Sequence, residues 1–200
     1  MTPHSTKAYL GFALAALLLT SWSCSSTSTG PGAYAEEPLD PLNDGGEDIK
    51  ADLPARTLPP LATLWEHYPL GTADEVKKLI GGNVNADWIV NTCAIRLSRA
   101  LNYSGFAIPG NVPGLNTVKG GDGKRYAYRV AELNRYLRKV ISTPDIVSTD
   151  EAAFAGQAGI IMFEVNWSDA TGHLDLWNGT EAIGHEYFDV AYKVSLWRTP

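Results

Sequence analysis

The pattern of apolar and polar positions predicts helices in the middle of the chain. From Thr92 to Tyr103, apolar residues recur at helical spacing on one side, with arginine and asparagine side chains on the other. The same pattern runs from Tyr126 to Ile141. A shorter helix is predicted by a Thr-x-x-Glu capping box that begins at Thr72.

The pattern changes to that of strands in the last part of the chain. Gly159 to Val165 is a compact apolar run suited to a buried strand, whereas His173 to Trp177 and Tyr192 to Trp197 alternate over most of their length. Asn178 and Gly179 follow the second strand as a strong hairpin signal. Helices followed by strands predict an α+β fold, with N-terminal helices packed on an antiparallel C-terminal sheet.

Residues 8–20 form an uncharged apolar run that follows Lys7. The run is too short to span a bilayer comfortably and has the length of a signal-peptide hydrophobic region, so residues 1–23 are predicted to be an export signal. Cys24 follows closely, as in a bacterial lipoprotein, but Ser21 and Trp22 depart from the residues usual before a lipidated cysteine. We therefore expect a secreted or periplasmic protein of the cell envelope, and the sequence leaves lipidation of Cys24 open.

Residues 24–60 are rich in Ser, Thr, Gly, Pro and acidic residues. Such a stretch buries too little apolar surface to offset its ordering entropy, so we predict a disordered linker before a folded domain at 61–200. The chain has 22 acidic and 16 basic residues, and much of the acidic excess lies in this linker. The folded region is therefore nearly neutral, which disfavours nucleic-acid binding. Two cysteines are also too few for a disulfide scaffold.

Cys93 is the candidate nucleophile of the folded region. It lies in the first turn of the predicted helix, directly after Asn91 and Thr92. The free amide hydrogens and the positive end of a helix stabilise a thiolate, which lowers the pKa of a thiol there, and the same amides can hold an oxyanion. The alternative is a small buried apolar residue on the inner face of the helix.

His173 is the candidate general base, because a thiol nucleophile needs an imidazole to take its proton. The imidazole needs a partner that fixes its orientation, and the sequence offers Asp175 or His185. Asp175 is two residues further along the same strand, where neighbouring Cα atoms lie roughly 7 Å apart, an awkward spacing for a tight contact. We therefore expect His185 as the third member and keep Asp175 as its alternative.

Two motifs carry a resemblance to a known family. The run from Asn91 to Ser98 (NTCAIRLS) and the run from Gly172 to Gly179 (GHLDLWNG) resemble the type VI secretion amidase effector family four. The similarity extends from about Leu61 to Trp197. Those enzymes are similar to NlpC-type papain-like cysteine peptidases, so the resemblance implies a papain-like or NlpC-like fold.

The resemblance also implies a function and roles for particular residues. It implies a peptidoglycan amidase that cleaves the γ-D-glutamyl to meso-diaminopimelate bond of stem peptides, with Cys93 as the nucleophile and His173 as the general base. The family usually has an aspartate eleven residues after this histidine, and that position is Gly184 here. NlpC-type peptidases often have a polar residue about twelve residues on, which falls on His185. A non-catalytic cell-envelope binding module of the same fold is the alternative.

The partners follow from the same reasoning. The four histidines form no recognisable metal set, so we expect no metal and no cofactor. The expected partners are a peptidoglycan peptide as substrate and an immunity protein, with membrane attachment only through lipidation of Cys24. The export signal departs from the family pattern, because an effector injected by a secretion needle needs none, and this weakens the expectation of an immunity protein.

Overall fold

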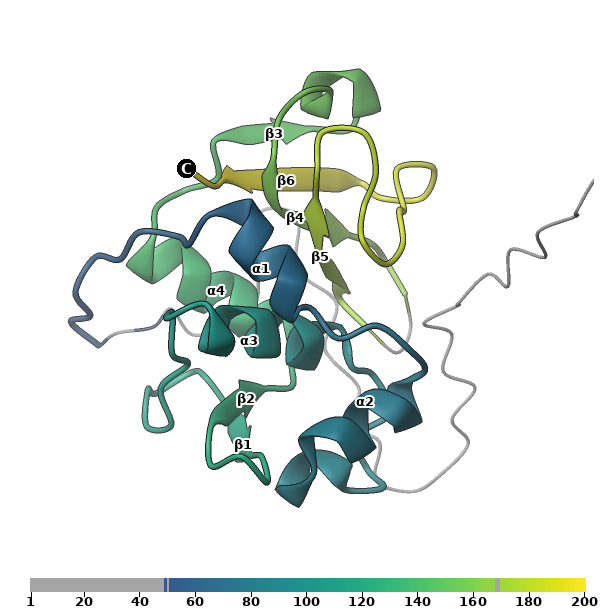
Figure 1. Cartoon of the computed structure of the whole chain (residues 1–200). Coiled ribbons are helices and arrows are strands. Elements are labelled where there is room, and N and C mark those ends of the chain that lie inside the picture. The colour runs from purple at the N-terminus through teal and green to yellow at the C-terminus, as the bar shows by residue number, and fades with distance from the viewer. Residues whose placement is uncertain (1–48, 50, 168–169) are drawn as a thin grey trace, which may run out of the picture.

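The computed structural model describes residues 49, 51–167 and 170–200 (Figure 1). The predicted export signal, Cys24 and most of the predicted linker lie outside these residues. Within the described part of the chain, no helix is long and apolar enough to cross a membrane.

Most helices precede the main sheet along the described chain, as the sequence predicts. The helical elements are α1 (Leu61–His67), α2 (Ala73–Ile80), the 3₁₀ turn η1 (Gly82–Asn85), α3 (Cys93–Tyr103), α4 (Val130–Val140) and the 3₁₀ turn η2 (Glu151–Phe154). The strands are β1 (Thr117–Lys119), β2 (Arg125–Ala127), β3 (Ile146–Ser148), β4 (Gly159–Glu164), β5 (Gly172–Trp177) and β6 (Lys193–Arg198). This arrangement confirms the α+β fold class.

Two of the predicted helix starts are confirmed. At the start of α2, the Glu75 N–H donates to Thr72 Oγ1 at 3.3 Å, and the Thr72 N–H donates to Glu75 Oε2 at 2.7 Å. This reciprocal pair is the predicted capping box. Helix α3 begins at Cys93 and so places the thiol in its first turn.

The predicted start of the third helix is wrong. Arg125–Ala127 form β2 instead, and Tyr126 lies opposite Val118 of β1. Tyr126 is fully buried and its hydroxyl donates to Asp122, so tertiary contacts hold this segment extended. The helix begins at Val130 and ends at Val140, close to the predicted end.

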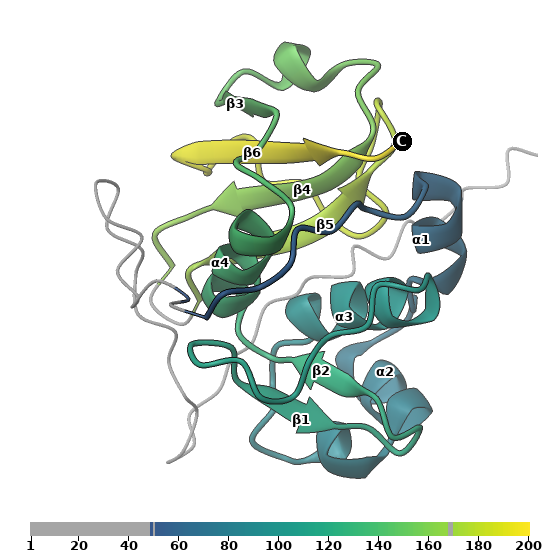
Figure 2. The same cartoon turned by 90° about the vertical axis from the view of Figure 1, so that its left-hand side faces the viewer.

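The main sheet has four strands in the order β3-β6-β4-β5, and all neighbouring strands are antiparallel. The two long sequence-predicted strands β4 and β5 pair along their whole length, so that Phe163 lies opposite His173 and Ile161 lies opposite Asp175. Strand β5 is at the edge of the sheet and contacts α3. Figure 2 shows α4 lying against the same sheet. Residues of α3 and β5 therefore meet at this edge.

Both faces of the sheet are buried. One face packs against α3 and α4 through Ile160, Met162, Leu174, Leu176 and Trp197. The opposite face packs around Phe154 through Ile161, Phe163, Trp177, Val194 and Leu196. Apolar and polar residues alternate in the last strand, but both of its faces are buried. The reason is that Phe154 and residues after β5 cover the second face of the sheet.

Residues 51–60 are packed on the domain, although the sequence predicts a disordered linker as far as Pro60. The Arg56 N–H donates to the Val140 carbonyl at 2.6 Å, and its guanidinium lies 3.5 Å from the centre of the Phe106 ring. Leu58 is 4% exposed. The few apolar residues of this segment pack against the core cluster that includes α4. The packed domain therefore begins before residue 61.

Candidate active site

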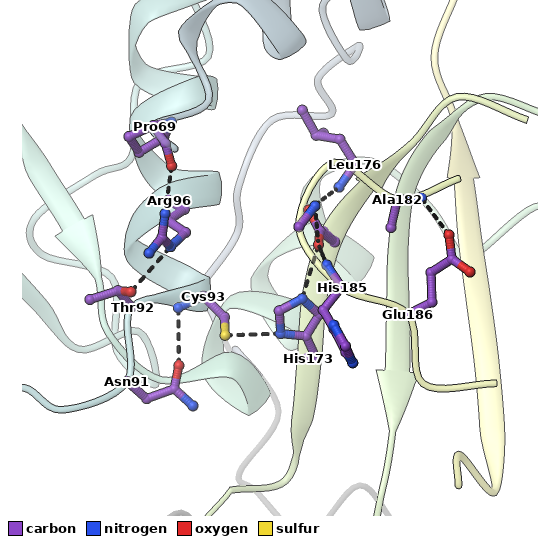
Figure 3. Close-up of polar contacts among 12 residues, drawn as sticks. Pro69, Asn91, Thr92, Cys93, Arg96, His173, Leu176, Ala182, His185 and Glu186 are labelled. Atoms are coloured by element: carbon purple, nitrogen blue, oxygen red, sulfur yellow. Dashed lines mark hydrogen bonds and ion pairs between the residues drawn. The ribbon is translucent and has the colours of Figure 1, made fainter. Parts of the chain in front are cut away.

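The nucleophile candidate is fixed by the turn that precedes α3. The Cys93 N–H donates to Asn91 Oδ1 at 3.0 Å, which satisfies one of the amides left free at a helix start. Cys93 is 1% exposed. The first turn of α3 therefore presents the thiol inside the protein, toward β5 (Figure 3).

Arg96 anchors this helix start to a separate segment. Its guanidinium donates to the Pro69 carbonyl at 2.7 Å and to the Gly71 carbonyl at 2.6 Å, and its Nε donates to Thr92 Oγ1 at 3.2 Å. These bonds join the residues before α2 to the first turn of α3. Arg96 thus holds the backbone from which Cys93 projects.

His173 comes from β5 and meets the thiol. Its Nδ1 lies 2.9 Å from Cys93 Sγ, and the residue is 4% exposed. The rings of Phe163 and Tyr187 flank it, with centroids 6.5 and 5.1 Å from its own. The structure therefore brings the two residues that the sequence proposes as nucleophile and base into direct contact.

Asp175 completes the set at the other ring nitrogen. Its Oδ2 lies 3.0 Å from His173 Nε2, and the carboxylate is fully buried. The expectation that a same-strand neighbour is too distant is wrong, because His173 and Asp175 project from the same face and their side chains reach across the gap between their Cα atoms. The imidazole is thereby held between a thiol and a carboxylate.

His185 does not occupy the expected place of third member. Its backbone N–H donates to Asp175 Oδ2 at 2.9 Å, so its contact with this carboxylate comes from the main chain. Its ring lies with its centroid 4.5 Å from that of Tyr187. In the structure it is the Asp175 carboxylate that meets His173 Nε2, and His185 contacts that carboxylate with its backbone N–H.

Tyr68 is a site residue that sequence reasoning missed. It follows α1 and is 5% exposed. Burial raises the pKa of its hydroxyl well above the usual value, and the negative charges of Asp175 and Cys93 raise it further. Tyr68 stays protonated as a neutral neighbour of the site. Nothing in its local sequence marks it, because long-range packing brings α1 to β5.

The donor set does not resemble a metal centre. Among the described residues, no group of three or more His, Cys, Asp or Glu side chains could hold a metal ion. A thiol in contact with an imidazole, which in turn contacts a carboxylate, is instead an arrangement used in nucleophilic catalysis.

Several solved structures similar to this chain are type VI effectors and effector–immunity complexes. The type VI effector Tae4 from Enterobacter cloacae is 34% identical to the chain with a TM-score of 0.68, over 73% of this chain and 99% of that chain. A chain of the Tae4–Tai4 effector-immunity complex from Salmonella Typhimurium is 32% identical with a TM-score of 0.67, over 71% of this chain and 99% of that chain. The class is that of papain-like amidases.

The family model for type VI secretion system (T6SS), amidase effector protein 4 matches residues 89–197, which include Cys93, His173 and Asp175. The chain belongs to this family, and it is an amidase that hydrolyses peptidoglycan. Its substrate places its action in the cell envelope. Among curated proteins, no match is found.

Proposed function

We propose that the chain is a cysteine amidase that hydrolyses the γ-D-glutamyl to meso-diaminopimelate bond of peptidoglycan stem peptides. The observation that carries the proposal is the 2.9 Å contact between Cys93 Sγ and His173 Nδ1, across which an imidazole can take a thiol proton. Membership of the amidase effector family supports the choice of an amide bond in peptidoglycan.

The first step is the transfer of the thiol proton. When Nε2 of His173 carries a proton, it donates to Asp175 Oδ2 at 3.0 Å, and Nδ1 is left to accept the proton of Cys93 Sγ. The product is a thiolate beside an imidazolium, with the Asp175 carboxylate on the far side of the ring. Asp175 keeps the ring in the orientation and tautomer that the transfer needs.

The thiolate then attacks the γ-carbonyl carbon of the D-glutamyl residue. A carbon–sulfur bond forms, and the carbonyl oxygen becomes an oxyanion for which backbone N–H groups at the start of α3 are the expected donors. In the structure the Cys93 N–H donates to Asn91 Oδ1. Stabilisation by this amide requires the oxyanion to replace the Asn91 oxygen.

The imidazolium of His173 next donates its proton to the leaving amine of diaminopimelate, and the carbon–nitrogen bond breaks. The acyl part stays on Cys93 as a thioester. A water molecule then gives a proton to His173 and attacks the thioester carbon, which releases the D-glutamyl carboxylate and restores the thiol. The two steps together consume one water per bond cleaved.

Digestion of purified muropeptides tests the proposal. We expect the full chain to release fragments that begin with diaminopimelate, identified by mass spectrometry, and we expect Cys93→Ala to release none. Cys24→Ser is the matched control because it removes the other cysteine of the chain. An inactive parent chain, or equal activity in Cys93→Ala, would refute the proposal.

The non-catalytic binding module receives no support from a particular observation. Its motivation is that Gly184 stands where an orienting acid is expected. Asp175 supplies a carboxylate to His173 from another position. The absence of an acid at residue 184 therefore does not argue against catalysis.

We also propose that an immunity protein binds the chain. Support comes from the related Tae4–Tai4 structures, which are effector–immunity complexes from Enterobacter cloacae and Salmonella Typhimurium. A Tai4-type protein that binds this chain should co-purify with it and inhibit muropeptide hydrolysis. Full activity at a saturating concentration of that protein would exclude this partner.

Residues 1–23 are proposed to direct export, with cleavage near Cys24. The support is the apolar run at residues 8–20. Mass spectrometry of the mature N-terminus distinguishes the outcomes: a free N-terminus shows simple cleavage, an acylated Cys24 shows a lipoprotein, and an uncleaved chain contradicts the export signal.

A further inference from the structure

The Asp175 carboxylate is held by two separate parts of the chain. Its own strand supplies the His173 ring at 3.0 Å and the Leu176 N–H at 2.9 Å. The segment that returns after β5 supplies the N–H groups of Gly184 and His185, at 3.0 and 2.9 Å from Oδ2. The carboxylate therefore occupies a small buried anion site that β5 and residues 184–185 form together.

Gly184 lacks a side chain for a reason other than its backbone. Its φ lies outside the left-handed region that favours glycine. A Cβ at this position would lie 2.6 Å from Asp175 Oδ2, 3.4 Å from Cγ and 3.5 Å from Oδ1. All three nearest atoms belong to Asp175, so this one carboxylate excludes a side chain from position 184.

The same distance shows that the anion site is within reach of position 184. In an aspartate, covalent geometry places each carboxylate oxygen about 2.4 Å from its own Cβ. The Cβ of residue 184 would lie 2.6 Å from the present Oδ2. An aspartate at position 184 can thus direct an oxygen toward the place where Asp175 now meets His173.

We propose that positions 175 and 184 are alternative sources of one carboxylate, and that Asp175 is the positioning residue of His173 in this chain. The inference rests on the proposed function for its catalytic readout. Two carboxylates in this space would repel each other and could not both stay ionised. An acid on β5 at position 175 thus requires a residue without a side chain at position 184, and that residue is Gly184.

The test transfers the acid between the two positions in the full chain. Asp175→Ala should lower kcat for muropeptide hydrolysis by about 10²–10⁴-fold, with a smaller change in KM, because the imidazole loses its orientation. Gly184→Asp alone should also lower kcat, because two carboxylates then compete for the site. The double variant Asp175→Ala/Gly184→Asp should recover at least about tenfold of the kcat lost in Asp175→Ala.

Two controls separate positioning from folding and from added charge. Asp175→Asn keeps the size of the side chain but not its charge, so it should fold and still show a reduced kcat. Thr180 is exposed in the same segment, and Asp175→Ala/Thr180→Asp adds a carboxylate away from the ring. This second double variant should show no recovery.

A substrate-independent readout keeps this inference apart from the proposed function. In a Cys24→Ser background, Asp175→Ala should raise the pH at which iodoacetamide alkylates Cys93 rapidly, because the imidazolium beside the thiolate loses its counter-charge. Adding Gly184→Asp to this Asp175→Ala variant should move that pH back toward the parent value. If the parent chain is inactive on muropeptides but the alkylation of Cys93 shifts as described, the proposed function is refuted and the shared carboxylate site is not. A double variant no better than Asp175→Ala in both assays, or equal rescue by Thr180→Asp, would overturn the shared carboxylate site.

Discussion

The two sides of the active site are built in different ways. On the nucleophile side, Asn91, Cys93 and Arg96 lie within a few residues of one another at the start of α3. On the base side, the partner of His173 is held by N–H groups of Gly184 and His185, which arrive only after the chain has turned back. A helix start can be recognised from adjacent residues, whereas an orienting carboxylate depends on which segments meet.

The largest effect is expected from breaking the base side. His173→Ala should lower kcat for muropeptide hydrolysis by about 10²–10⁴-fold, since the thiol loses the imidazole that contacts it and can accept its proton. His67 of α1 provides a matched control. Its ring packs near that of Tyr103, at the end of α3 opposite to Cys93. His67→Ala should keep the parent kcat. A similar loss in both variants would show that the His173 effect is structural.

The nucleophile side is expected to depend on its anchor. Arg96→Met removes the hydrogen bonds to the Pro69 and Gly71 carbonyls, so it should lower the free energy of unfolding by about 2 kcal/mol. Denaturant titration measures the change. Arg125 is exposed, and Arg125→Met should change stability by less than about 0.5 kcal/mol. Equal stability of the two variants would contradict the anchoring role.

A turn away from the site should affect stability without affecting catalysis. Burial alone would raise the pKa of Asp122, but hydrogen bonds from Tyr126 and the Lys124 N–H hold it below its usual value. A depressed folded-state pKa contributes stability above the unfolded value of about 3.9, and this contribution is lost as the pH falls through the folded pKa.

Asp122→Asn should therefore be less stable than the parent near pH 6, and the difference should shrink as the pH is lowered toward 2. Denaturant midpoints measured across this range provide the comparison, and kcat at neutral pH should stay unchanged. A stability difference that is constant with pH would contradict the role of the Asp122 charge.

The smallest effect is expected from the residue that the sequence favoured as third member. His185 contacts Asp175 through its backbone N–H, which alanine keeps. His185→Ala should therefore change kcat by less than about threefold, whereas Asp175→Ala loses far more. A loss of kcat in His185→Ala as large as that in Asp175→Ala would restore the His185 side chain as the orienting group.

The parts of the structure that could be predicted are those with local signals. The capping box at Thr72 and the helix start at Cys93 follow from adjacent residues. The strands β4 and β5 follow from apolar runs and alternation. The extended segment at Tyr126 could not be predicted, because it is held by its pairing with Val118 of β1.

The nucleophile and base could be proposed from the sequence, but the identity of the carboxylate could not be decided. Spacing along an ideal strand argues against Asp175, and the approach of residues 184–185 that fixes its carboxylate is a long-range contact. Tyr68 and residues 51–60 were missed for the same reason, since only the folded domain provides the surfaces that they cover.

Trapping the covalent intermediate tests the central claim most directly. Rapid acid quenching of the full chain with a muropeptide, followed by peptide mass spectrometry, should find a thioester on Cys93 that carries the stem peptide up to its D-glutamyl residue. Hydroxylamine should remove this adduct, and His173→Ala should accumulate little of it. Hydrolysis of the bond with no adduct on Cys93, or an adduct that carries diaminopimelate, would contradict the account.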